Sequence, residues 1–253
     1  MLLHILITTL LVLGAVGHAA AQAPAGSADL WKDCQGQQPD QALKACTQII
    51  EAKAEPAARL AQAHNLRATV HQRMGQPDKA IADFGQGIQL MTSAGKSGWE
   101  LAFIYFMRAN TYRAMGNLDQ AIADHSESIR MAPTWDKSYN DRGALYFQKG
   151  DFARALDDIS KVISFRPDSP RVADSYAIRA MLHRRMGEPT KGLPDADRAV
   201  ELNPRSAMAL YVRAKIYEAL GRSEDAAASM RAALAIDPRL SEQMEAMERA
   251  GGK

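Results

Sequence analysis

Apolar and polar positions alternate along the chain with the spacing of helices, and glycine interrupts this pattern at regular intervals. In the stretch DRGALYFQKGDFARALDDI, from Asp141 to Ile159, one helical pattern ends at Gly150 and another begins directly after it. A glycine at such a point adopts, at little cost, the left-handed backbone conformation that ends a helix. The stretch therefore predicts two helices joined by a tight turn.

Five copies of this hairpin follow one another, and several positions agree when the copies are aligned on the turn glycine. The glycines are Gly75, Gly116, Gly150, Gly187 and Gly221. Eight residues before them stand Arg67, Arg108, Arg142, Arg179 and Arg213. Four residues before them stand His71, Tyr112, Tyr146, His183 and Tyr217. Eight residues after them stand Asp83, Asp124, Asp158, Asp195 and, in the last copy, Ser229. Seventeen residues after them stand Pro133, Pro167, Pro204 and Pro238, with Thr92 in the first copy.

Helix packing gives this repeat a physical reason. A small residue follows each arginine, and another recurs five positions after each glycine, so the paired helices can approach closely. Proline ends the second helix because it cannot continue the hydrogen-bond ladder. One hairpin cannot bury its apolar face alone, so we expect neighbouring hairpins to stack into a superhelix. We expect Pro194, which falls within one second helix, to be the first residue of a shortened helix.

The order of small residue, ring, glycine, small residue and proline resembles the tetratricopeptide repeat family, as does the spacing of the glycines, which lie 41, 34, 37 and 34 residues apart. The chain departs from the family's usual alanine at Gly87, Ser128 and Val162. The resemblance implies an all-α fold, an α-solenoid of five helical hairpins over residues 57–238 in an exported, bacterial-type member. We expect a capping hairpin over residues 22–56 and a capping helix and tail over residues 239–253.

The recurring arginines and aspartates predict structural, charge-assisted ion pairs. The expected members are Arg67, Arg108, Arg142, Arg179, Asp83, Asp124, Asp158 and Asp195. An anion-binding site is the alternative, but a feature repeated in every unit is more often structural. The spacing leaves open whether Arg142 pairs with Asp158 of its own copy or with Asp124 of the preceding copy.

The N-terminal segment has the features of a secretory signal peptide. The apolar run Ile5–Gly17 is too short to span a bilayer comfortably, and small residues follow it at Ala19–Ala23. We predict a signal peptide over residues 1–21, with cleavage after Ala21 or alternatively after Ala23. The mature protein is then periplasmic or secreted, without stable membrane insertion. An uncleaved anchor and a buried helix are the alternatives.

Export changes the interpretation of the two cysteines, Cys34 and Cys46. They flank the turn Gly36–Asp40, and the following segment, PDQALKACTQIIEA, is expected to form a helix that starts at Pro39 or Asp40. An even number of cysteines in an oxidising compartment predicts a disulfide. Two buried free thiols are the alternative. A metal site is disfavoured because no histidine or further cysteine lies nearby with ligand spacing.

Charge and motifs give no support to catalysis or to nucleic-acid binding. The 31 basic and 29 acidic residues give a net charge of +2, so no strong attraction to nucleic acid is expected. The motifs GxSxG, HExxH, CxxC and the P-loop do not occur, and we expect no enzyme activity, cofactor or metal. His64, His71 and His125 are expected to serve packing.

The family resemblance implies a concave groove, lined by the first helix of each unit, that binds a peptide or a partner protein. From their helical positions, the strongest groove candidates are Asn65, Phe106, Asn110, Arg113, Asn140, Arg184, Arg185, Tyr211 and Lys215. Asparagine can hold a peptide backbone, and arginine can bind a carboxylate with two hydrogen bonds. A solvated polar face is the alternative. We expect an adaptor or assembly factor of the cell envelope; the alternatives are an enzyme or accessory domain with an unrecognised site and a self-associating structural protein.

Overall fold

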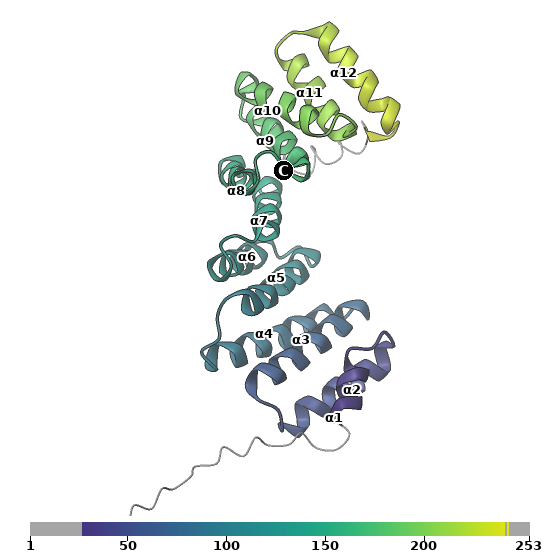
Figure 1. Cartoon of the computed structure of the whole chain (residues 1–253), viewed down its shortest axis with the longest axis vertical. Helices are drawn as coiled ribbons and strands as arrows, with labels where there is room; N and C mark the ends of the chain where they lie inside the picture. The colour runs from purple at the N-terminus through teal and green to yellow at the C-terminus, as the bar shows by residue number, and fades with distance from the viewer. Residues whose placement is uncertain (1–26, 241, 243–253) are drawn as a thin grey trace, which may run out of the picture.

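The computed structural model describes residues 27–240 and residue 242, which form twelve α-helices and one short 3₁₀ helix without any strand (Figure 1). The expected signal peptide lies outside the described residues, as does the capping helix and tail expected over residues 239–253 apart from residues 239, 240 and 242. The elements are α1 (Ser27–Cys34), α2 (Pro39–Ala52), α3 (Ala57–Arg73), α4 (Pro77–Ser93), α5 (Trp99–Ala114), α6 (Leu118–Met131), α7 (Asp136–Gln148), α8 (Phe152–Phe165), the 3₁₀ helix (Pro170–Val172), α9 (Ala173–Arg185), α10 (Pro189–Leu202), α11 (Ala207–Ala219) and α12 (Ser223–Ile236).

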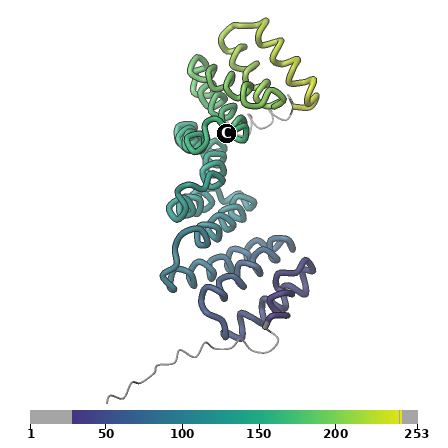
Figure 2. Tube along the Cα trace, viewed as in Figure 1, coloured from purple at the N-terminus to yellow at the C-terminus, as the bar shows by residue number. Residues whose placement is uncertain are grey.

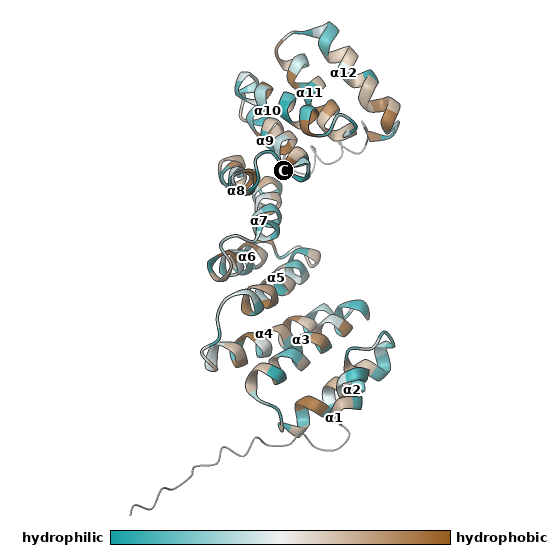
Figure 3. Ribbon diagram, in the orientation of Figure 1, coloured by the Kyte–Doolittle hydropathy of each residue, from teal (hydrophilic) through white to brown (hydrophobic). Residues whose placement is uncertain are grey.

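Ten of the helices form five hairpins, α3–α4 to α11–α12, which we call units 1 to 5. Helices α1 and α2 form a further hairpin that packs on α3, and we call it the capping hairpin. The units are stacked in chain order along an elongated array, with the capping hairpin at one end and unit 5 at the other (Figures 1 and 2). The helices carry both hydrophobic and hydrophilic bands (Figure 3). The expected all-α solenoid is therefore confirmed.

The turn within each unit has the backbone that the glycine pattern predicts. The five turn glycines all have positive φ, between 67° at Gly75 and 79° at Gly116. In unit 3, Gly150 donates its N–H to the carbonyl of Phe147, and Asp151 donates to the carbonyl of Tyr146 at 2.9 Å each. These bonds satisfy carbonyls that the end of the first helix would otherwise leave unpaired. A side chain at the glycine position would be strained there.

Small residues lie where the two helices of a unit cross. In unit 3, a Cβ added to Gly143 would lie 3.4 Å from both Asp158 and Ile159. In unit 4, a Cβ added to Gly192 would lie only 2.8 Å from the carbonyl oxygen of Ala180. The contact at Gly192 is too short even for a methyl group, whereas those at Gly143 leave space for a methyl group and little more, so only small residues fit at these positions.

The expectation that Pro194 begins a shortened helix is wrong. Helix α10 starts five residues earlier, at Pro189, and Pro194 lies inside it. The first turn is retained because Gly192 packs against α9 and Lys191 donates its N–H to the carbonyl of Glu188 at 3.0 Å. A proline inside a helix removes one hydrogen bond and crowds the carbonyl four residues earlier, and tertiary packing here outweighs that cost.

In units 1 to 4, the arginine of the repeat binds the aspartate of its own unit through two hydrogen bonds. Arg142 donates from Nε to Asp158 Oδ2 at 2.9 Å and from Nη2 to Asp158 Oδ1 at 2.7 Å. The same two bonds, at 2.7–2.8 Å, join Arg67 to Asp83, Arg108 to Asp124 and Arg179 to Asp195. The hydrogen bonds that Arg142 donates to Asp158 raise the pKa of Arg142 above its ordinary value, although burial opposes the change.

The third nitrogen of the same guanidinium reaches back to the preceding unit. Arg142 donates from Nη1 to Ser126 Oγ at 2.8 Å, and the Ser126 hydroxyl donates to the carbonyl of Ile122. Arg179 reaches Ser160 Oγ of unit 3 at 3.4 Å in the same way. We call the arginine with its own aspartate and the residue of the preceding unit the arginine clamp. One side chain thus joins the two helices of a unit and also two successive units.

Two clamps differ from this pattern. In unit 2, Arg108 Nη1 faces Gly85 of unit 1, which has no hydroxyl to accept a hydrogen bond. In unit 5, the arginine has Ser229 in place of an aspartate, and Arg213 Nε donates to its Oγ at 3.2 Å. The carboxylate near Arg213 comes instead from the preceding unit, where Asp197 Oδ1 lies 3.8 Å from Nη1. Ser229 is the departure from aspartate that the sequence repeat already shows. Gly85 and Asp197 stand ten residues after their turn glycines, a position that is not among the recurring ones.

Rings flank the clamp arginines. The guanidinium of Arg142 lies 5.9 Å from the centroid of Tyr139 and 5.8 Å from that of Tyr146. Unit 1 carries His64 and His71 at the corresponding positions. These imidazoles contact the clamp aspartate, with His64 Nδ1 2.8 Å from Asp83 Oδ1 and His71 Nε2 3.7 Å from Asp83 Oδ2.

The neighbours of Asp83 stabilise its charged form. Burial would raise the pKa of this carboxyl, but hydrogen bonds from Arg67 and His64 outweigh burial and lower it. Asp83 is therefore a bound carboxylate of the clamp.

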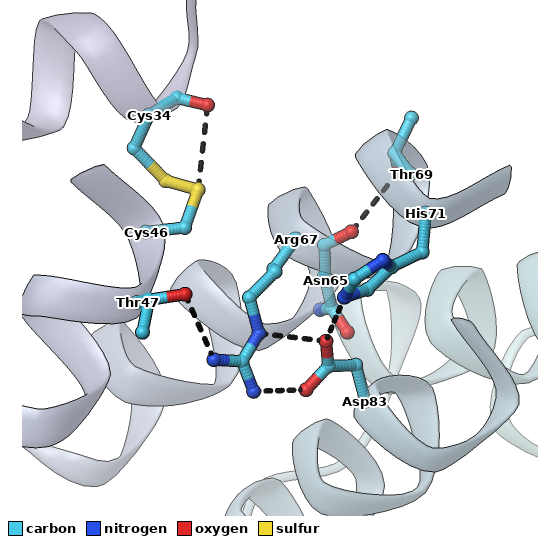
Figure 4. The surroundings of a disulfide bond; sticks show 8 residues. All are labelled: Cys34, Cys46, Thr47, Asn65, Arg67, Thr69, His71 and Asp83. Atoms are coloured by element: carbon cyan, nitrogen blue, oxygen red, sulfur yellow. Dashed lines mark hydrogen bonds and ion pairs between the residues drawn. A yellow bond between two sulfur atoms is a disulfide. The ribbon is translucent and has the colours of Figure 1, made fainter. Parts of the chain in front are cut away.

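A disulfide closes the capping hairpin, as the sequence predicts. Cys34, at the end of α1, and Cys46, in α2, are bonded, and both side chains are buried (Figure 4). The next residue, Thr47, accepts a hydrogen bond from Arg67 Nη1 at 3.2 Å, so the capping hairpin serves the clamp of unit 1 as a preceding unit would. Trp31 of α1 donates from Nε1 to Glu55 at 2.9 Å and lies under the guanidinium of Arg59.

His125 of α6 lies at the core position that Phe84 occupies in unit 1, and its side chain is fully buried. Its ring meets Phe106 at 5.5 Å between centroids, and neither ring nitrogen has a hydrogen-bond partner among the described residues. Burial, reinforced by the positive charges of Arg113 and Arg142, lowers the pKa of His125 to about 3. The imidazole is therefore neutral in the folded protein.

We expect His125 to make the protein sensitive to acid. Its pKa is about 3 when folded and 6.5 in a model peptide, so the unfolded chain binds the extra proton as the pH falls below about 6.5. This group should remove about 2–3 kcal/mol of the free energy of unfolding between pH 7 and pH 4.5. Urea unfolding of wild type and His125→Phe at both pH values checks this, because all other titrating groups are common to the two proteins. An equal loss of stability in both would contradict the prediction.

Candidate functional site

Two hollows lie between successive first helices of the units. The N-terminal hollow lies between α3 and α5 and has a volume of about 610 Å³. The C-terminal hollow lies between α7 and α9, reaches Met208 of α11, and has a volume of about 560 Å³. Both volumes are in the range of sites for small ligands or for a few residues of a peptide.

The C-terminal hollow is lined by both apolar and polar side chains. The apolar ones include Ala144, Phe147, Ile178, Met181, Leu182 and Met208. The polar ones are Asn140, Gln148, Arg171, Asp174 and Ser175. Asp174 is held in place by the Ser206 hydroxyl, whose oxygen lies 3.2 Å from its Oδ1. Such a lining can contact an apolar side chain and also offers donors and acceptors to a backbone.

The N-terminal hollow is more polar. Gln62, Asn65 and Thr69 of α3 line one side, and Glu100 of α5 lines the other. The Asn65 Oδ1 is buried against Gly87, where an added Cβ would lie only 2.5 Å away, and it has no hydrogen-bond partner among the described residues. The glycine that departs from the repeat pattern thus makes room for the amide of Asn65.

Aromatic rings extend the N-terminal hollow toward unit 3. Trp99 and Phe103 of α5 line the hollow, and Trp135, directly before α7, lies against them. The ring centroids are 4.4 Å apart for Trp99 and Trp135, and Phe103 lies 6.3 Å from each tryptophan. Phe106 packs below Trp135 at 4.6 Å. We call Trp99, Phe103, Phe106 and Trp135 the aromatic shelf.

The structure places the nine expected groove residues in different surroundings. Asn65 and Asn140 line the N-terminal and the C-terminal hollow respectively, and Phe106 belongs to the aromatic shelf. The Asn110 Oδ1 is buried without a hydrogen-bond partner among the described residues. Arg113 Nη1 lies 3.7 Å from Asp141 Oδ1.

The remaining candidates lie toward the C-terminal units. The guanidinium of Arg185 lies 5.8 Å from the ring of Phe147, which belongs to the floor of the C-terminal hollow. Arg184 follows the same helix, α9. Tyr211 is only 1% exposed, and Lys215 lies over its ring and bonds Glu218 at 2.9 Å. Binding by these residues stays a prediction, and Tyr211 offers little surface to a ligand.

Sequence reasoning missed Trp99 and Trp135. The groove candidates follow from positions within the first helices, and these two tryptophans lie at or before the start of their helices. A usable signal was present, because the chain has only three tryptophans and two of them precede successive units.

No group of three histidine, cysteine, aspartate or glutamate side chains in the described part of the chain could hold a metal ion. Within the same residues, no helix is long and apolar enough to cross a membrane. His64 and His71 belong to the clamp of unit 1, where Asp83 is already bound by Arg67.

Comparisons with solved structures support the fold. BtubC (BKLC) from P. vanneervenii is 15% identical, with a TM-score of 0.66 over 84% of this chain and 92% of that chain. YrrB, described as a TPR protein with an unusual peptide-binding site, is 18% identical, with a TM-score of 0.62 over 81% and 98%. A MamA protein is 17% identical, with a TM-score of 0.60 over 72% and 94%. At such identities the likeness shows the fold alone.

Family models give the assignment. A search of curated proteins found no match. One model described as tetratricopeptide repeat matches residues 106–170 and 179–241, and a second with the same description matches residues 59–134. These matches span all five glycine-centred hairpins. The chain belongs to the tetratricopeptide repeat family.

Proposed function

We propose that the protein is an exported adaptor that binds an extended segment of a partner protein along the face formed by its first helices. The family is one of protein-interaction scaffolds, which supports a protein or peptide as the partner. The observation that carries the proposal is the pair of hollows in series between first helices, each lined by both apolar and polar side chains. An extended peptide presents side chains and polar backbone groups along its whole length, so it can contact both the apolar and the polar lining.

The clamp residues and the polar residues that line the C-terminal hollow are different sets, which supports this site. The clamp arginines and aspartates bind one another between the helices of a unit, and polar residues that line the C-terminal hollow, such as Asn140 and Gln148, take no part in the clamp. Gln148 has no counterpart in the other units, whereas Asn140 stands at the same repeat position as Asn65, which lines the N-terminal hollow. Surface of this kind is where a repeat protein can acquire a binding site.

Export is supported by two independent features. The apolar run Ile5–Gly17 followed by small residues is typical of a signal peptide. The disulfide between Cys34 and Cys46 is typical of proteins in oxidising compartments. Together they favour a role in the cell envelope or outside the cell.

We expect an arginine at position 144 to block binding. Ala144 is an exposed residue of α7 that lines the C-terminal hollow, so Ala144→Arg fills the hollow and leaves the core intact. Affinity for the partner should fall about tenfold or more, which corresponds to ~1.4 kcal/mol. The measurement is capture from envelope extract, followed by titration of the captured protein against both forms.

The matched control is Ala153→Arg, an exposed alanine of the second helix of the same unit, α8. It should capture the partner as wild type does. Both substitutions should change the free energy of unfolding by about 0.5 kcal/mol or less. Equal capture by all three proteins would move the binding surface away from the first helices.

We expect the mature chain to begin at Gln22. Mass spectrometry of the intact protein recovered from the periplasmic fraction or the medium measures this directly. Cleavage after Ala23 would also agree with export. A chain that keeps residues 1–21 and stays with the cytoplasmic or membrane fraction would contradict it.

A further inference from the structure

The aromatic shelf exposes rings that a folded protein would ordinarily bury. Trp99 is 55% exposed and Phe103 is 43% exposed, and they are the two exposed aromatic rings in the described part of the chain. They lie side by side on α5, four residues apart, and share Trp135 as a neighbour. Exposed aromatic clusters of this kind mark interaction sites more often than single exposed rings do.

The shelf is held in place from below. Trp135 packs on Phe106, and Phe106 packs on the fully buried His125. The rings are therefore connected to the core of unit 2 through a continuous series of contacts. A preformed surface of this kind loses little conformational freedom when a ligand binds.

Amide groups lie next to the shelf. Gln62 and Asn65 of α3 line the same hollow as Trp99 and Phe103. A chain in the polyproline II conformation makes no internal hydrogen bonds, so its carbonyls require donors from solvent or from a binding surface. Amide side chains and an indole N–H beside aromatic rings meet this requirement.

Charge around the N-terminal hollow is balanced. Its charged lining residues are Arg59, Lys96 and Glu100. Arg59 is already engaged by the ring of Trp31, at 4.1 Å, and by Glu55, at 3.6 Å. One lysine and one glutamate remain, so charge complementarity favours a neutral ligand over an acidic or a basic one.

From these observations we propose that the aromatic shelf and the adjoining N-terminal hollow bind a neutral, proline-rich segment in the polyproline II conformation. Proline rings pack on Trp99, Phe103 and Trp135, and the carbonyls of the segment accept hydrogen bonds from Gln62 and Asn65. This inference rests on the proposed function, since it names the class of peptide read by one part of the same face. Aromatic-lined grooves recognise such segments because their conformation is already ordered before binding.

The test uses a blocked synthetic peptide of four Ala-Pro-Pro repeats and the same peptide with every proline replaced by alanine. Binding to the full-length protein is followed by tryptophan fluorescence and calorimetry. Trp99 and Trp135 report on the shelf, whereas Trp31 is buried in the capping hairpin. The proline peptide should change the fluorescence and bind at least about tenfold more tightly than the alanine peptide.

Variants locate the site. Trp99→Ala and Phe103→Ala should each weaken binding of the proline peptide by about tenfold. Met115→Ala, which removes a similarly exposed apolar side chain after the end of α5, should bind as wild type does. Equal affinity of wild type and Trp99→Ala, or equal affinity for the two peptides, would overturn the proposal.

Other occupants give distinct results, each of which also overturns it. Self-association in sedimentation experiments that is lost in Trp99→Ala would mean that a second copy covers the shelf. Fluorescence changes with a soluble oligosaccharide and none with the proline peptide would mean that the rings stack on sugars. If the proline peptide fails while Ala144→Arg still abolishes capture of the partner, this inference falls and the proposed function stands.

Discussion

The arginine clamp is the interaction on which the rest of the structure depends. One guanidinium, such as that of Arg142, binds the aspartate of its own second helix with two nitrogens and the preceding unit with the third. A buried carboxylate without such a partner would be costly, because it would lose its hydration without compensation. The clamp therefore satisfies the charge while it fixes both the hairpin and the stack. Where the pattern changes, in unit 5, Asp197 of the preceding unit supplies the carboxylate instead.

Placing the clamp between the two helices leaves the outer face of the first helices to other uses. That face differs strongly from unit to unit: it is apolar around Met181, amide-rich around Asn65 and aromatic around Trp99. A scaffold whose repeated positions carry stability can vary the remaining positions with little cost to the fold. The aromatic shelf and part of the lining of the two hollows are accordingly made of residues that differ between units, although Asn65 and Asn140 share one repeat position.

The sequence was sufficient for the hairpins because turn chemistry is local. Gly150 and its counterparts needed no tertiary information to be placed at positive φ. The partner of Arg142 could not be chosen in this way, since Asp124 and Asp158 fit the spacing equally well and only the packed array brings Asp158 within reach. Pro194 was misplaced because the contact of Gly192 with α9 outweighs the local preference of proline. Phe106 of the shelf was among the predicted groove residues, but Trp135 was missed because it lies before its helix, where helical periodicity gives no direction.

The third arginine nitrogen joins successive units. Unit 2 offers a direct test of this role, because Gly85 leaves Arg108 without that bond. An added Cβ at Gly85 would lie 3.6 Å from Arg108 Nη1, an ordinary contact, so serine fits there as Ser126 does in the next unit. Alanine is the better helix former, yet Gly85→Ser should raise the free energy of unfolding by roughly 0.5–1 kcal/mol more than Gly85→Ala. Urea unfolding of the two variants measures the difference. A serine variant no more stable than the alanine variant would contradict the claim.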